Sequence, residues 1–271
     1  MRRHVKPSVN EARVINSVCL QENVYSLVVR MSLTHGIQSI PKSGQFYMLR
    51  AKPSSVLLAR PISIYTARIL DSNGNEKVSI HNIAKDSISE ILDGDEIELN
   101  FLILKKGEGT SDLCFMRNGE SIDITGPLGN NFFKPGEMLA AASKSKTAEN
   151  RSVTTPSVAI VGGGIGIAPV AGFALGLEDK SYDFFASFKT GSYGLEGLKS
   201  STLTITTDDG SVGVKGMLPA VLTAQTLIEK QYTLVYACGP LPMLAYVQKI
   251  CLEAGVQSWL SMEEKMGCGV G

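Results

Sequence analysis

The chain has 271 residues, of which 44% are hydrophobic, so it can form two ordinary domains and wholesale disorder is excluded. Its 26 basic residues equal its 26 acidic residues, which leaves no global field to attract nucleic acid or an anionic membrane. No stretch approaches the roughly 20 apolar residues that are needed to span a bilayer.

The cysteines and the N-terminus favour a cytoplasmic location. The five cysteines contain no CxxC pair and form no even set, which is typical of reduced thiols in a chain of this size. Residues 1–4 are basic but no apolar run follows them, so a secretory signal is not expected.

Up to about residue 130 the pattern predicts an antiparallel β domain. Short runs rich in β-branched and aromatic residues recur at 25–29, 45–49 and 62–65. Clusters of turn-forming residues separate such runs, at 71–75 and 93–95. Short strands at regular spacing are typical of a small barrel or sandwich.

After a polar, aperiodic stretch at 141–155, which we interpret as a surface loop, the pattern changes to strands alternating with helices. This alternation predicts a parallel sheet with helices on its faces, which binds ligands at the carboxyl ends of its strands. The expected strands are 157–161, 184–186, 203–206 and 234–237, and the expected helices are 167–177, 217–231 and 242–254.

The glycine-rich segment 157–169 is the strongest local signal. A buried strand leads into Gly162–Gly166 and then into a helix whose start Pro169 helps to fix. Glycines let the backbone approach a pyrophosphate, although a tight turn that binds nothing gives the same pattern. The segment departs from GxGxxG, because the third glycine is replaced by Ile167. Asp183, the one candidate for the acidic ribose-binding residue, precedes the next strand instead of ending it.

Two segments of the β domain are candidates for binding a diphosphate. Arg60, held by Pro61 at the start of a strand, could clamp a diphosphate, but a solvated arginine at an edge strand is more common. In segment 107–113, Thr110 is a candidate N-cap for a short helix that ends near residues 118–119. Most helix starts of this kind bind no phosphate.

Three further segments are weak when taken singly. Segment 126–132 is by itself a turn. Segment 235–243 combines a strand end, a Gly-Pro break and a helix start, and its Cys238 fits a small buried apolar residue as well as a reactive group. Cys268 lies in a glycine-rich end that suits an iron–sulfur loop, but a single cysteine cannot hold a cluster and a flexible tail gives the same pattern.

The order of these segments is more specific than any of them. RPISIYTA, GEGTSDL, GPLGNNF, VAIVGGGIGIAP, VYACGPLPM and EEKMGCGVG follow one another over residues 14–271. This series resembles the ferredoxin–NAD(P) reductase superfamily and, within it, the electron-transfer subunits of NAD-linked dihydroorotate dehydrogenases. The resemblance implies an antiparallel six-stranded Greek-key FAD-binding barrel (1–137), a linker (138–156), a Rossmann-like parallel-sheet NAD-binding domain (157–259) and the start of an iron–sulfur loop (260–271).

The resemblance also implies which residues bind the cofactors. Arg60 would lie at the FAD pyrophosphate and Ser63 near flavin N5. The residues implied for FAD are Arg60, Pro61, Ile62, Ser63, Leu102, Ile103, Leu104, Gly109 and Thr110. Those implied for the nicotinamide dinucleotide are Gly162, Gly163, Gly164, Ile165, Gly166, Cys238, Gly239 and Pro240, with residues 207–211 nearby. No catalytic acid or base is expected, and Ser63 and Cys238 would be nearest the reacting rings.

Three features depart from the family pattern. Cys268 matches the first 2Fe–2S ligand, but the remaining three cluster cysteines are not among the 271 residues, so this chain is not expected to complete a cluster. Leu104 stands where many relatives carry a basic residue. The stretch 71–100 is longer than the usual connection, which indicates an added hairpin.

The function that the resemblance implies is electron transfer. The resemblance implies a dihydroorotate dehydrogenase catalytic subunit as the partner, in a heterotetramer. Electrons from that subunit would reach NAD⁺ through 2Fe–2S and FAD. Hydride transfer needs the nicotinamide against the flavin, so two nucleotide sites are expected to face each other. A related reductase serving a sulfide dehydrogenase or a glutamate synthase-like complex, and a non-catalytic nucleotide-binding remnant, stay open as alternatives. The sequence does not distinguish NADH from NADPH.

Overall fold

The computed structural model describes residues 9–33, 40–79, 91, 94–132 and 157–262. The described residues form two compact units, the first ending at Asn131 and the second beginning at Phe132. The expected linker 138–156 lies outside the described residues, as does Cys268 with most of the expected iron–sulfur loop. Among the described residues, no helix is both long enough and apolar enough to cross a membrane.

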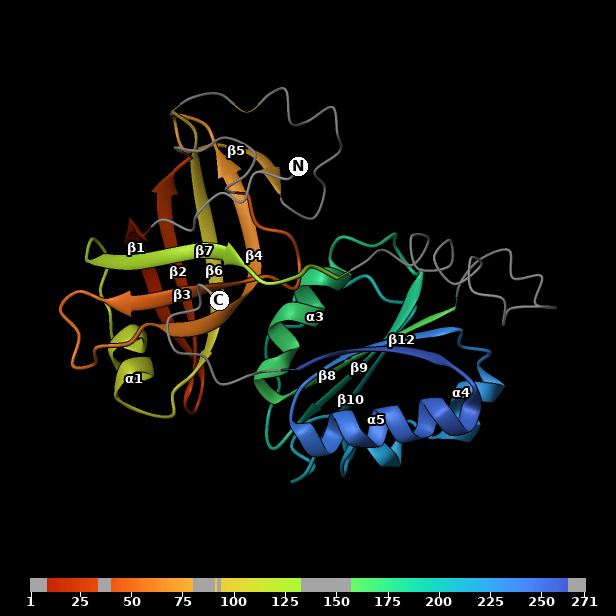
Figure 1. The fold of residues 1–271 in the computed structure, drawn as a ribbon. Helices are drawn as coiled ribbons and strands as arrows, with labels where there is room; N and C mark the ends of the chain where they lie inside the picture. Colours follow the sequence, from red (N-terminus) through yellow and green to blue (C-terminus); the bar gives the residue numbers. More distant parts are fainter. Residues whose placement is uncertain (1–8, 34–39, 80–90, 92–93, 133–156, 263–271) are drawn as a thin grey trace. The chain divides into compact units, whose positions relative to one another are not determined.

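The first unit contains an antiparallel barrel (Figure 1). Its strands follow the order β3-β7-β1-β2-β6-β4, and the pairing of β3 with β4 closes the ring, while β5 adds to the free side of β4. The predicted six-stranded barrel is therefore confirmed. The strands are β1 (Val9–Gln21), β2 (Val24–Ser32), β3 (Phe46–Ala51), β4 (Arg60–Leu70), β5 (Glu76–Ser79), β6 (Glu96–Leu104) and β7 (Ser121–Leu128).

Alternation of apolar and polar residues builds the barrel core. On β2, Leu27 and Val29 are fully buried, whereas Arg30 on the opposite face is only half-buried. Tyr47 and Phe101 meet edge to face inside, with ring centroids 5.7 Å apart. Burial raises the pKa of Tyr47, so its hydroxyl stays protonated in the core.

The hairpin from β4 to β5 turns on Asp71. Its Oδ1 accepts hydrogen bonds from the backbone N–H groups of Asn73 (2.9 Å) and Asn75 (2.8 Å), and Gly74 has φ +82°. This hairpin begins the stretch 71–100, in which an added hairpin was predicted. Residues 80–90 and 92–93 of that stretch lie outside the described residues.

The short helix α1 (Glu108–Cys114) corrects one sequence-based expectation. Its N-cap is Gly107, not Thr110, and it ends at Cys114 instead of near residues 118–119. Thr110 lies one turn inside, where its Oγ1 accepts from the backbone N–H groups of Lys106 (2.9 Å) and Gly107 (3.1 Å). A threonine can accept hydrogen bonds from backbone N–H groups at a helix start both from the N-cap and from the third helical residue. Its presence alone therefore does not determine where the helix begins.

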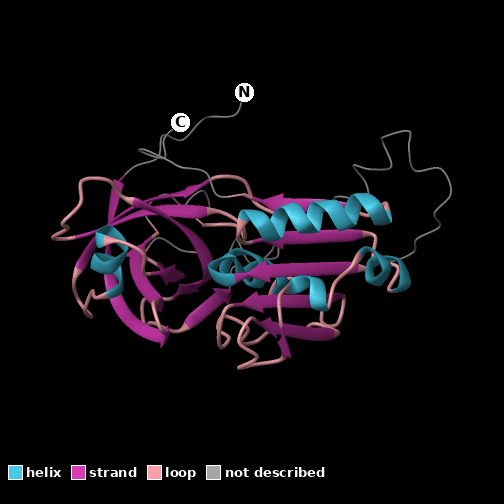
Figure 2. Cartoon of the chain, turned by 90° about the horizontal axis from the view of Figure 1, so that it is seen from below, coloured by secondary structure: helices cyan, strands magenta, loops and turns pink. Residues whose placement is uncertain are grey.

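The second unit is a β-sheet with helices packed on it (Figure 2). All its strands are parallel, and their order is β11-β10-β9-β8-β12-β13. The predicted Rossmann-like architecture is confirmed. Its strands are β8 (Val158–Gly163), β9 (Tyr182–Phe188), β10 (Thr202–Thr207), β11 (Val214–Lys215), β12 (Leu234–Cys238) and β13 (Gln257–Ser261). Its helices are η4 (Gly164–Gly166), α3 (Ile167–Ala174), η5 (Leu218–Ala220), α4 (Ala224–Glu229) and α5 (Leu241–Ala254).

Helices cover both faces of this sheet. Tyr236 of β12 packs against Phe173 of α3, with ring centroids 4.8 Å apart. The neighbouring β12 residue Val235 points to the other face and joins a core cluster with Leu244 and Val247 of α5. A strand that is buried on both faces has a continuous run of apolar residues in its sequence, and β8 shows this pattern.

The single helix predicted over 217–231 is wrong. The structure has η5 followed by α4, and Thr223 separates them as the N-cap of α4. Its Oγ1 accepts a hydrogen bond of 3.1 Å from the backbone N–H of Thr226. A threonine inside an apolar helical pattern can begin a new helix as well as continue the old one, and here it begins one.

Candidate functional site

In the barrel, the structure brings the two candidate diphosphate-binding segments together. Arg60 is the first residue of β4, and its side chain lies against Gly109 of α1. A Cβ atom added to Gly109 would stand 2.6 Å from Arg60 Nε and 2.9 Å from Val56 Cγ2. Only glycine therefore lets the guanidinium take this position.

The charge of Arg60 is available to a ligand. Arg60 forms no ion pair with any described residue, and its side chain is half-buried. A guanidinium offers a planar set of N–H donors that match phosphate oxygens. The neighbouring backbone carries no side chain at Gly109, which leaves room for close approach. The cradle of Arg60 and Gly109 therefore fits the diphosphate of FAD.

The rest of the first predicted FAD segment lies along the start of β4, beside β3. Pro61, Ile62 and Ser63 are paired with Met48, Tyr47 and Phe46, respectively. Pro61 is exposed, whereas Ile62 and Ser63 are half-buried, so this edge of β4 is accessible.

The second predicted FAD segment is at the end of β6 and is less accessible. Ile103 is fully buried in the barrel core, and Leu102 on the other face is 3% exposed. Only their backbone atoms are therefore available to a ligand. Leu104, the departure from the family pattern, is half-buried and paired with Val24.

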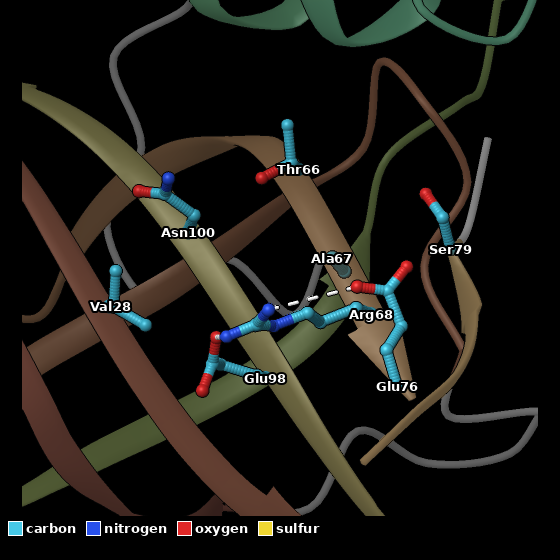
Figure 3. A pocket seen from close by; sticks show the side chains of 8 residues that line it. All are labelled: Val28, Thr66, Ala67, Arg68, Glu76, Ser79, Glu98 and Asn100. Atoms are coloured by element: carbon cyan, nitrogen blue, oxygen red, sulfur yellow. Dashed lines mark hydrogen bonds and ion pairs between the residues drawn. The ribbon is translucent and has the colours of Figure 1, made fainter. Parts of the chain in front are cut away.

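A cavity of about 400 Å³ lies elsewhere on the barrel, on the outward faces of β2, β4, β5 and β6 (Figure 3). Arg68 extends across it and pairs with Glu98 (2.6 Å) and Glu76 (3.7 Å). Both carboxylates are thus paired with arginine, and none of the predicted cofactor-binding residues lines the cavity. The lining residues are Val28, Thr66, Ala67, Arg68, Glu76, Ser79, Glu98 and Asn100.

In the second unit, the two predicted dinucleotide segments meet at the carboxyl ends of adjacent parallel strands. The register of β8 and β12 places Gly162 beside Cys238. Beyond the strands, a Cβ on Gly166 would stand 2.6 Å from both the N and the Cα of Gly239. The turn after β8 thus packs backbone to backbone on the turn after β12, and no larger residue fits at Gly166.

Gly164 faces open space in the same turn. It has φ +52°, and a Cβ built on it would meet no heavy atom within 4 Å. At Gly163, by contrast, an added Cβ would stand 2.5 Å from Met243 Sδ. The turn is thus packed against protein on one side and open at Gly164, ahead of the start of α3. A backbone without side chains at the carboxyl end of a parallel strand fits a dinucleotide pyrophosphate.

Cys238, Gly239 and Pro240 follow directly from the end of β12. Cys238 is the last residue of the strand and is 4% exposed, while Pro240 is the N-cap of α5. The sulfur is thus mostly buried, and Gly239 and Pro240 supply the surface at this edge. Ile165, the remaining predicted residue, is half-buried within η4.

The loop 207–211 leaves the same edge of the sheet, at the end of β10. Ser211 donates from its hydroxyl (2.7 Å) and from its backbone N–H (2.9 Å) to Asp209 Oδ1. These hydrogen bonds, that of the Ser211 hydroxyl first, lower the pKa of Asp209 to about 2. The Ser211 hydroxyl also accepts from the backbone N–H of Gly191 (2.8 Å), which ties the loop to the one after β9.

Asp183 lies inside β9 near its start, and not before the strand as predicted, but it is away from the carboxyl end of the strand as expected. It is the second residue of β9, and its carboxylate accepts a hydrogen bond from the Tyr232 hydroxyl. Its place is therefore structural and away from the nucleotide edge.

The described residues provide no metal centre. Among them, no three or more His, Cys, Asp or Glu side chains are grouped so that they could hold a metal ion. Cys19, Cys114, Cys238 and Cys251 form no disulfide with one another, and Cys268 lies outside the described residues.

One contact was not anticipated from the sequence. Asp112 of α1 binds Ser54 and Ser55, which lie more than fifty residues earlier in the chain. Segment 107–113 was singled out only for its glycines and Thr110. The only local sign of such a contact is the pair of adjacent serines, Ser54 and Ser55, that precedes Arg60.

Comparison with known proteins identifies relatives over almost the whole chain. The chain is 30% identical over 269 residues to the dihydroorotate dehydrogenase B (NAD(+)), electron transfer subunit, of Clostridium acetobutylicum, covering 98% of this chain and 87% of the relative. The protein of the same description from Clostridium perfringens is 30% identical over 267 residues, covering 96% and 85%. No family profile matches the chain.

Solved structures share the fold at lower identity. A ferredoxin reductase in carbazole 1,9a-dioxygenase has a TM-score of 0.64 at 21% identity, covering 95% of this chain and 70% of that one. A ferredoxin NADP⁺ reductase from Neisseria gonorrhoeae with bound FAD and NADP has a TM-score of 0.60 at 12% identity, covering 96% and 100%. Both support the arrangement of a barrel followed by a parallel sheet.

Proposed function

The chain belongs to the family of dihydroorotate dehydrogenase B (NAD⁺) electron transfer subunits, and from that premise we propose that it passes electrons from a dihydroorotate dehydrogenase catalytic subunit through FAD to NAD⁺. The observation that carries this proposal is the 30% identity over 269 residues, which includes both units. In this role the protein acts in pyrimidine biosynthesis. The catalytic subunit is its partner, and dihydroorotate binds there.

FAD belongs in the barrel, at Arg60 and Gly109. The guanidinium would bind the oxygens of the diphosphate, and Gly109 keeps the space that the arginine needs. Ser63, half-buried on β4, offers a hydroxyl beside the flavin ring. Pro61, Ile62, Leu102, Ile103, Leu104 and Thr110 complete the proposed FAD-binding set.

The nicotinamide dinucleotide belongs at the glycine turn of the second unit. Gly164 is the open position for the pyrophosphate, while Gly163 and Gly166 pack the turn against the protein. Gly239 and Pro240 present the edge that would meet the nicotinamide, with Cys238 behind them. The loop 207–211 follows the neighbouring strand and suits the ribose of the same ligand.

The protein's own residues act by position and not by proton transfer. FAD, when bound, would supply the redox chemistry, because a flavin can exchange electrons singly or in pairs and NAD⁺ takes up a pair as a hydride. Arg60 and the glycine turn bind the phosphates and so orient the attached rings, which supplies much of the rate in a hydride transfer. Ser63 and Cys238 are the proposed nearest neighbours of the reacting rings, and neither needs to titrate.

We derive no step through a 2Fe–2S centre. The described residues contain no group of ligands for one, and the proposed ligand Cys268 lies outside them. We place the protein in the cytoplasm, where cysteines that form no disulfide are typical, as for Cys19, Cys114, Cys238 and Cys251.

Mixing the subunits tests the proposal. The purified chain, loaded with FAD, is combined with the catalytic subunit from the same organism, and dihydroorotate-dependent reduction of NAD⁺ is followed. We expect reduction that needs both subunits and that falls with Arg60→Ala in proportion to its lost flavin. A flavin-loaded chain that neither binds the catalytic subunit nor supports NAD⁺ reduction would contradict the proposal.

A further inference from the structure

The segment that delivers Arg60 to the cradle is not fixed by burial. Residues 52–59 connect β3 to β4, and none of them is buried. Leu57 is 84% exposed and Leu58 is 49% exposed. A segment without buried apolar side chains lacks the packing that usually orders a loop, so polar contacts must order it.

Asp112 of α1 supplies those contacts. Its Oδ2 accepts hydrogen bonds from the Ser54 hydroxyl (2.9 Å), the Ser55 backbone N–H (2.8 Å) and the Ser55 hydroxyl (2.9 Å). The hydrogen bond from the Ser55 backbone N–H is the main reason why the pKa of Asp112 is lowered. The carboxylate is therefore ionised at neutral pH. Hydrogen bonds to a charged acceptor are stronger than those between neutral groups.

The same helix holds the other end of this segment. Gly109 lies one turn before Asp112 in α1, and its Cα faces both Val56 and the Arg60 guanidinium. Helix α1 therefore contacts the segment at Ser54 and Ser55, again at Val56, and finally at Arg60. Among the described contacts between α1 and this segment, only those at Asp112 are charge-assisted hydrogen bonds.

We propose that Asp112 is a positioning residue for FAD binding, which fastens the segment before Arg60 to α1 and holds the guanidinium over Gly109 before the cofactor arrives. This inference rests on the proposed function, because it takes Arg60 as the group that binds the FAD diphosphate. A clamp that is ordered in advance binds more tightly, since less conformational freedom is lost on binding.

FAD titration of variants tests the proposal. Asp112→Ala removes all three hydrogen bonds, and we expect the dissociation constant for FAD to rise about tenfold. Asp112→Asn keeps an oxygen acceptor in place and should recover most of that loss. In an Arg60→Ala background, Asp112→Ala should change the constant by less than about twofold, because its effect passes through the arginine.

Asp71→Ala is the matched control. Asp71 also accepts backbone N–H groups in a loop of the barrel, at the far end of β4 from Arg60. We expect this variant to bind FAD as the wild type does. Equal weakening by Asp71→Ala and Asp112→Ala, or an undiminished effect of Asp112→Ala without Arg60, would overturn the positioning role.

Proteolysis of the cofactor-free protein measures the segment directly. Thermolysin cuts before leucine, and Leu57 and Leu58 are exposed. Cleavage there should be faster in Asp112→Ala than in the wild type and unchanged in Asp71→Ala, whereas equal cleavage of all three would overturn the inference. If the wild-type chain binds FAD and Asp112→Ala binds it with the same affinity, this inference alone is contradicted. If the wild-type chain binds no FAD, the proposed function is contradicted as well.

Discussion

The Arg60 guanidinium lies against the bare Cα of Gly109, where a methyl group would stand only 2.6 Å from Arg60 Nε. The two residues are 49 positions apart in the sequence, on β4 and α1. Because the arginine side chain can move and the helix backbone cannot, a larger residue at 109 must displace the arginine. The absence of a side chain at Gly109 thus determines where the Arg60 guanidinium lies.

Gly109→Ala should therefore weaken FAD binding without unfolding the barrel. We expect the dissociation constant for FAD to rise about tenfold or more, since a charge-assisted contact to the diphosphate is displaced. Flavin fluorescence titration measures it. Gly107→Ala is the control in the same helix end, because a Cβ there meets no atom within 4 Å. Equal affinity of both variants would mean that Arg60 does not act from this position.

Gly166→Ala should destabilise the second unit. The new methyl group would meet the backbone of Gly239 at 2.6 Å, and neither backbone can rotate away. We expect the free energy of unfolding to fall by about 1–3 kcal/mol, as for other overpacked sites. Trp259 on β13 is the only tryptophan of the chain, so its fluorescence during urea unfolding reports on this unit alone. An unchanged transition would show that the two turns are not in contact.

Gly164→Asn should affect the nucleotide and not the fold. Asparagine tolerates the positive φ of +52°, and nothing of the protein occupies the space in front of it. The Trp259 transition should therefore shift by less than about 1 kcal/mol. The NADH dissociation constant should rise at least about tenfold, because the side chain fills the place proposed for the pyrophosphate. An unchanged NADH dissociation constant would show that the pyrophosphate does not bind at Gly164.

The cysteines should differ in their reaction with iodoacetamide. Cys19 is exposed, whereas burial raises the pKa of Cys114 and that of Cys251 to about 11. At pH 8 this lowers the thiolate population about 100-fold relative to an ordinary thiol, and labelling of both should speed up as the pH rises toward 11. Peptide mass spectrometry after brief labelling should find Cys19 modified and the other two free. Equal labelling of Cys114 and Cys19 in folded protein would contradict the burial.

The sequence predicted those elements whose pattern is local. A run rich in β-branched and aromatic residues identified β2, and the apolar run of β8 leading into glycines identified the strand, turn and helix of the second unit. It missed β13, a short strand of mixed polarity that pairs with β12 alone. An edge strand of this kind is defined by its neighbour and not by its own residues.

The sites were predictable in part only. The order of the motifs indicated which residues to examine, but the contacts between them are non-local. Gly166 packs on Gly239, which is 73 residues further on, and Asp112 binds Ser54, which is 58 residues earlier. Nothing in either local sequence specifies such a pair, because the strand order of each sheet creates the proximity.

The most direct test of the central claim is a visible absorption spectrum of the FAD-loaded protein, recorded before and after NADH is added without oxygen. We predict one FAD per chain, and bleaching of the flavin band by a stoichiometric amount of NADH. Gly109→Ala should need more FAD to reach full loading, and Gly164→Asn should need more NADH to bleach the band. A protein that stays colourless with FAD, or one whose bound flavin is left oxidised by excess NADH, would contradict electron transfer between the two cofactors.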